Sequence, residues 1–123
     1  MDITAFSQSK YRDRQSAGDD SMLIVPESVI ALFDGATDHL HEVEDYVSAG
    51  RVASRAAAQI CAKMFGEMGM KQASTKRLLS AISKRFYNRI QDSDSACHPS
   101  TTMAMALFFD SDSGENSAAR SRR

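Results

Sequence analysis

Two groups of aspartates in the first third of the chain have the types and the spacing needed to hold a divalent cation. Asp19 and Asp20 are followed by Ser21 and then by a short apolar run at residues 22–25, and Asp34 ends a second apolar run and precedes Gly35. Carboxylates that are brought together repel one another unless a cation neutralises them, and oxygen ligands suit Mg²⁺ or Mn²⁺. The three acids therefore form a candidate metal site. The alternative is an ordinary polar turn and a strand-ending acid.

The two apolar runs predict the hairpin that would position these acids. Residues 22–25 and 29–33 are short and partly β-branched, and residues 26–28 between them contain a proline, which is the pattern of two strands joined by a turn. In an antiparallel hairpin the start of the first strand lies beside the end of the second. We therefore expect the three acids at one end of the sheet. Gly35 has no side chain and allows close approach to the main chain.

Two amphipathic helices are expected after the hairpin. Apolar residues recur at helical spacing over residues 50–68, and again over residues 74–90, where Ser74 or Thr75 is the expected N-cap. Both helices also carry basic side chains. Because acids and bases nearly balance over the whole chain, a solvated basic face is favoured over a nucleic-acid contact.

A third strand is expected at residues 100–109, with apolar side chains on both faces. This pattern predicts a strand buried between layers, as in a sandwich covered by helices. Partial alternation over residues 2–9 predicts a further strand at the start of the chain. The expected fold class is α+β, a partial β-sandwich flanked by two α-helices.

The order of these features resembles a known family. An acidic pair precedes a short strand, a hydrophobic strand ends in Asp-Gly, and Ser-Thr-Thr precedes another apolar strand. In this order they resemble the N-terminal half of the metal-dependent serine/threonine phosphatases of the protein phosphatase 2C family. The matching segments are residues 16–21, 29–38 and 99–109.

The resemblance implies a truncated four-layer αββα phosphatase-like fold. Residues 1–109 would be the N-terminal half of the phosphatase domain, and residues 110–123, which have almost no apolar side chains, would be a disordered polar tail. Members of this family continue further, and their later segments supply at least two more metal-binding aspartates.

The resemblance also implies a reaction, the hydrolysis of a phosphoserine or phosphothreonine ester by metal-activated water without a covalent intermediate. Asp34 would bridge two Mg²⁺ or Mn²⁺ ions, Asp19 would contribute to one ion and the Gly35 carbonyl to the other, and Asp20 would hold coordinated water. Two ions occupy the full family domain. Without the later aspartates we expect at most one weakly held ion here.

Two other family positions are matched in part. In the family, an arginine ahead of the acidic pair binds substrate phosphate. The candidates in this chain are Arg14 and Arg12, although Gln15 occupies the aligned position. A histidine often follows Asp-Gly in the family and protonates the leaving group, whereas this chain has alanine there. His39 and His41 are the candidates for that acid, and a water molecule is the alternative.

Composition narrows the class of protein and its partners. The chain has 123 residues and a formal net charge of -1, so neither nucleic acid nor an anionic membrane is expected as a partner. Without a membrane-length apolar stretch or a secretory signal pattern, a cytoplasmic location is expected. Cys61 and Cys97 have no CxxC spacing, which indicates reduced structural thiols.

A phosphorylated protein is the expected partner, and the open strand edges of a partial sandwich also predict self-association. Two other interpretations stay open. One is a non-catalytic, phosphatase-derived binding module, which the missing later acids favour. The other is a structural α+β domain without a site. A phosphatase of the haloacid dehalogenase type also has a strand running into Asp-Gly, but Leu32 occupies its nucleophile position here.

Overall fold

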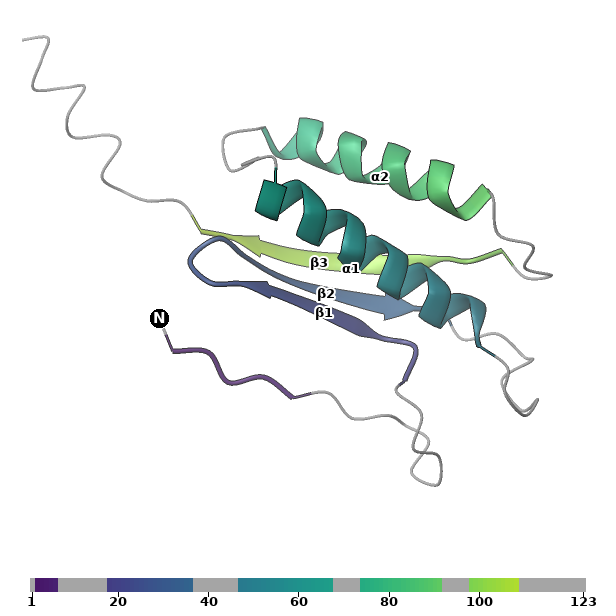
Figure 1. Cartoon of the computed structure of the whole chain (residues 1–123), viewed down its shortest axis with the longest axis horizontal. Helices are drawn as coiled ribbons and strands as arrows, with labels where there is room; N and C mark the ends of the chain where they lie inside the picture. Colours follow the sequence, from purple (N-terminus) through teal and green to yellow (C-terminus); the bar gives the residue numbers. More distant parts are fainter. Residues whose placement is uncertain (1, 7–17, 37–46, 68–73, 92–97, 109–123) are drawn as a thin grey trace, which may run out of the picture.

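Three strands and two helices make up the fold of the computed structural model, which describes residues 2–6, 18–36, 47–67, 74–91 and 98–108. The strands form one antiparallel sheet in the order β1-β2-β3, and both helices lie on the same side of it (Figure 1). The predicted α+β class is confirmed. Along the chain the elements are β1 (Ser21–Val25), β2 (Val29–Gly35), α1 (Ala49–Glu67), α2 (Thr75–Gln91) and β3 (Thr101–Leu107).

The β1–β2 hairpin forms as the apolar runs predict. The backbone pairs run from Ser21 with Phe33 to Val25 with Val29. The Ser28 N–H donates to the Val25 carbonyl oxygen at 3.0 Å and closes the turn. This register places the end of β2 beside the residues that precede β1, which is where the acids stand.

The side of the sheet that faces the helices holds the core. Buried positions alternate along β2, so only one of its faces is covered. α1 contacts all three strands, and α2 packs against α1. Burial of these apolar side chains supplies the main stabilisation of the fold. The buried cluster consists of Val29, Ala31, Phe33, Ala57, Ile60, Cys61, Met64, Phe65, Leu78 and Ile82.

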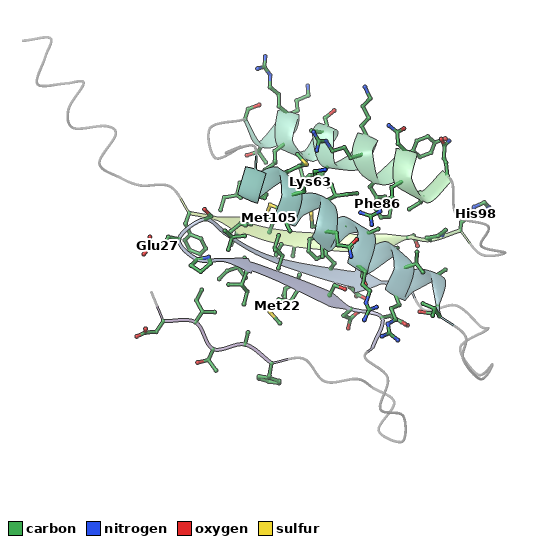
Figure 2. All side chains as sticks on the ribbon, in the orientation of Figure 1. Met22, Glu27, Lys63, Phe86, His98 and Met105 are labelled. Atoms are coloured by element: carbon green, nitrogen blue, oxygen red, sulfur yellow. The ribbon has the colours of Figure 1, made fainter. Side chains whose placement is uncertain are left out.

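The other side of the sheet is an open face over the described residues. Leu32 in the central strand is 53% exposed, and Ala104 and Ala106 of β3 are exposed. Figure 2 shows Met22 on this side, away from the helices, whereas Met105 lies on the side that the helices cover. The prediction of a β3 covered on both faces is therefore wrong. The apolar pattern predicts a strand that suits two layers, but the described residues supply only one covering layer.

The start of the chain differs from the remaining expectation for a strand. Residues 2–6 form no strand, so the strand predicted at residues 2–9 is absent from its described part. Residues 7–9 and the predicted tail at residues 110–123 lie outside the described residues. Within the described part of the chain, neither helix combines the length and the apolar character that crossing a membrane requires.

Two glycines let the start of α1 touch the end of β2. A Cβ atom added to Gly35 would overlap the carbonyl oxygens of Gly50 and Asp19, and one added to Gly50 would overlap the Ala36 carbonyl group. The obstructing atoms belong to the backbone, so they cannot rotate away as the end of a side chain can. Both positions therefore require glycine if α1 is to lie this close to the sheet.

A pair of alanine substitutions in α1 tests this contact. Gly50→Ala should lower the free energy of unfolding by about 1–3 kcal/mol or more, because the added methyl group overpacks against the backbone. Gly66→Ala makes the same change where nothing lies within 4 Å of the added atom. It should raise the free energy of unfolding by about 0.5–1 kcal/mol, because alanine favours helix. Urea unfolding measures both values, and equal effects would contradict the close contact.

Candidate functional site

Asp20 and Asp34 are neighbours at the open end of the β1–β2 hairpin. Ser21 pairs with Phe33, so the next position outward in the same register sets Asp20 opposite Asp34. Residues opposite one another in a sheet share a face. Both aspartates are exposed and line one pocket of about 280 Å³, to which Met22, Leu32 and Phe6 also contribute.

Strand β3 holds the Asp34 main chain in place. Asp34 lies in the central strand, where its register partner in β3 is Thr102. Its carbonyl oxygen accepts a hydrogen bond from Thr101 Oγ1 at 2.8 Å. Because this backbone is fixed by the sheet, only the side-chain torsions of Asp34 remain to be set when a ligand binds. The carboxylate is thus presented from a rigid element.

Asp19 has a different environment from Asp20. It does not line the pocket, and its Oδ1 accepts a hydrogen bond from Ser48 Oγ. Asp19 lies at a bend directly before Asp20, and the two side chains have different surroundings. The structure brings two of the three predicted acids together and places the third against the start of α1.

Ser48 caps α1 and connects it to Asp19. Its Oγ accepts the Arg51 N–H at 3.1 Å, its carbonyl oxygen accepts the Val52 N–H at 3.1 Å, and only 7% of the residue is exposed. The negative charge of Asp19 lies at a helix N-terminus, where the helix dipole favours it. The sequence-based start of this helix at residue 50 missed Ser48. A serine just ahead of a helical apolar pattern indicates an N-cap, so the sequence did contain a signal for this helix start.

A second serine pair joins the hairpin to the same helix. Ser21 Oγ and Ser54 Oγ lie 3.0 Å apart, and Ser54 is fully buried. Burying a hydroxyl is costly unless it is hydrogen-bonded, and Ser54 Oγ also donates to the Arg51 carbonyl oxygen at 3.3 Å. These bonds fix α1 relative to the strand that begins directly after Asp20.

The other predicted site residues divide into two groups. Gly35 is buried in β2, and its missing side chain accommodates the main chain of α1. The metal-binding role of its carbonyl stays a prediction. The candidate phosphate-binding and acid residues lie outside the described residues, so their roles also stay predictions. These are Arg12, Arg14, His39 and His41.

Asp20 and Asp34 would provide two of the ligands that a divalent cation needs. Within residues 2–6, 18–36, 47–67, 74–91 and 98–108, no group of three His, Cys, Asp or Glu side chains is placed to hold a metal ion. Mg²⁺ is often bound by only one or two carboxylates, and water and substrate phosphate complete its octahedral coordination. Asp20 and Asp34 fit that smaller donor set.

The buried thiol of Cys61 is not a candidate nucleophile. Cys61 is 0% exposed, and burial raises the pKa of its thiol to about 11. Nucleophilic attack by cysteine requires the thiolate, so at neutral pH this side chain serves as a small apolar group in the core. Cys97 lies outside the described residues.

Comparison of the chain with protein-family models, with curated proteins and with solved structures found no match. A function for this chain therefore has to be argued from the placement of its own residues.

Two serine substitutions test the connection between Asp19 and α1. Ser48→Ala should lower the free energy of unfolding by about 1.5–3 kcal/mol, because it removes both an N-cap bond and a buried bond to a carboxylate. Ser74→Ala removes the exposed N-cap of α2, whose Oγ accepts the Arg77 N–H at 3.4 Å. It should cost about 0.5–1 kcal/mol. Chemical denaturation compares the two, and an equal loss would mean that the bond to Asp19 adds nothing.

Proposed function

We propose that this chain is a metal-dependent phosphoprotein phosphatase-like domain, related to the N-terminal half of protein phosphatase 2C. The observation that carries the proposal is the position of Asp20 and Asp34, which lie across the hairpin from one another and line one pocket. The proposed architecture is half of a four-layer αββα fold, and a single sheet with both helices on one side is compatible with it. The proposed substrate is a phosphoserine or phosphothreonine side chain of a cytoplasmic protein.

Asp20 and Asp34 would hold one Mg²⁺ or Mn²⁺ ion in this proposal. Such an ion neutralises charge on phosphoryl oxygens and lowers the pKa of coordinated water. Two protein carboxylates leave most of the coordination positions for water and substrate, and we expect weak binding because affinity depends on the number of charged ligands. Asp19 acts indirectly, since its bond to Ser48 fixes the segment from which Asp20 projects.

The pocket walls would help to orient the substrate. Phe6, Met22 and Leu32 line the same pocket as the two carboxylates. Their apolar surface would contact the carbon atoms beside the phosphoryl group of the substrate. The rigid β2 backbone keeps Asp34 in position while the phosphoryl group binds.

A non-catalytic binding module is the second candidate. It is favoured by the lack of a third metal-binding side chain among the described residues. A module of this kind would bind a cation or a phosphorylated partner at the same pocket without hydrolysing it. A structural domain without a site is the remaining interpretation.

Hydrolysis of a small aryl phosphate in the presence of Mn²⁺ distinguishes these functions. We expect turnover that requires Mn²⁺ and falls about 100-fold in Asp34→Asn, because the substitution removes one of two charged ligands. Glu27→Gln is the matched control, since Glu27 is exposed at the opposite end of the hairpin (Figure 2). It should keep full activity.

Binding of Mn²⁺ without turnover would support the binding module instead. Failure to bind Mn²⁺ would leave only the structural domain. Circular dichroism of both variants checks that a loss of activity is not a loss of folding.

We also propose that two copies associate through the strand edges. β1 and β3 are the edges of the sheet, and exposed edges next to apolar side chains favour pairing with another chain. The β3 edge is the better candidate, because Ala104 and Ala106 are exposed there. Ala106 pairs with Ile30 near the hairpin turn, so pairing at this end leaves the Asp20 and Asp34 pocket accessible.

Sedimentation velocity tests the association. Ala106→Lys should weaken it by about tenfold or more, because a lysine on an edge strand opposes pairing. Ser80→Lys adds the same charge to the exposed side of α2 and should have little effect. A monomer at all concentrations, or equal weakening by both variants, would contradict association through β3.

A further inference from the structure

The two helices concentrate positive charge on one side of the molecule. They carry eight cations and one acid, a net charge of +7, whereas the chain as a whole has a net charge of -1. The helices cover one side of the sheet, and Asp20 and Asp34 line a pocket on the other side. The eight cations are Arg51, Arg55 and Lys63 in α1, and Lys76, Arg77, Lys84, Arg85 and Arg89 in α2.

Two of these cations line one pocket between the helices. Arg55 of α1 and Arg89 of α2 both border a pocket of about 240 Å³. Arg89 Nη2 donates a hydrogen bond to Gln59 Oε1, which holds its guanidinium group across the space between the helices. No carboxylate of the described residues lines this pocket. The remaining lining residues are Val52, Ala56 and Ile90.

This arrangement favours an anion with two charges. Two guanidinium groups at one pocket repel each other, and a bound anion removes that cost. The planar fork of arginine matches the oxygens of phosphate or carboxylate. A phosphate monoester carries a charge of about -1.5 to -2 at pH 7, which balances two arginines, whereas a single carboxylate balances only one. The apolar side chains on the pocket wall suit the carbon atoms of an ester.

We propose that the Arg55–Arg89 pocket binds a phosphate monoester and is a second site, separate from the Asp20 and Asp34 pocket. The phosphoryl group has two possible sources with the same chemistry, a small phosphorylated molecule or a phosphorylated side chain of a protein. The site requires no divalent cation, so the inference does not depend on the proposed phosphatase function.

Titration of the ¹⁵N-labelled protein with O-phosphoserine in the presence of EDTA tests the site. We expect saturable shifts of the Gln59 side-chain amide and of the backbone amides around Arg55 and Arg89. Arg55→Gln and Arg89→Gln should each weaken binding by about tenfold, since each removes a charge-assisted hydrogen bond. Arg77→Gln removes the same charge from an exposed position of α2 outside the pocket. It should leave the affinity within about twofold of the unmodified protein, as expected for an exposed charge.

Three results would overturn the proposal. These are the absence of saturable shifts, equal weakening by all three variants, or tighter binding of a short RNA that all three variants weaken alike. Equal weakening by all three variants, whether of O-phosphoserine or of RNA binding, would mean that the positive charge of both helices attracts anions without a specific pocket. Tighter binding of a phosphoserine peptide than of O-phosphoserine identifies a protein source, and the reverse identifies a small molecule. Asp34→Asn should not change these shifts, because Asp34 lies in the other pocket. The tests of the two proposed sites are therefore independent.

Discussion

The fold depends on the contact between two stretches of main chain that meet at Gly35 and Gly50. Because neither residue has a side chain, the start of α1 lies directly against the end of β2, and the Asp19 carbonyl group joins the same contact. This proximity places Ser48 where it caps the helix and donates to the Asp19 carboxylate. The same contact sets the distance between α1 and the sheet. At this distance the small and apolar residues of α1 fill the core.

The two sides of the sheet consequently differ in chemistry. The side under the helices is apolar, and the helices that cover it carry the positive charge. The opposite side carries Asp20 and Asp34 at one end of the hairpin. A cation and an anion would thus be attracted to opposite sides of one small domain. The register of the β1–β2 hairpin positions the acid pair, since Asp20 directly precedes β1 and lies opposite Asp34 of β2.

Local patterns predicted most of the elements. The helices predicted at residues 50–68 and 74–90 are observed at Ala49–Glu67 and Thr75–Gln91, because helical periodicity and N-cap serines are short-range signals. The hairpin follows from two apolar runs and a proline-containing turn. The open face was not predictable in this way, because whether a second layer covers a strand depends on residues far from it in the sequence. Over residues 2–6, the described part of the predicted first strand, the weak alternation does not suffice for a strand.

Prediction of the site was partial for related reasons. The hairpin pattern predicts that Asp20 and Asp34 lie at one end of the sheet, as they do, whereas no local pattern shows the bend at Asp19 or its bond to Ser48. The sequence pattern predicts that a ligand approaches the main chain at Gly35. In the structure it accommodates Gly50, a partner that no local pattern identifies. The same holds for Arg55 and Arg89, which are brought together only by the packing of α1 against α2.

The proposed function depends on the joint binding of a divalent cation by Asp20 and Asp34. Anomalous diffraction from crystals grown with Mn²⁺ tests it most directly, because it locates the ion without depending on turnover. We expect one anomalous peak in the pocket at about 2.0–2.3 Å from a carboxylate oxygen of each aspartate, the usual distance for such ions. A peak only beside Asp19, or no peak in the pocket at saturating Mn²⁺, would contradict the claim.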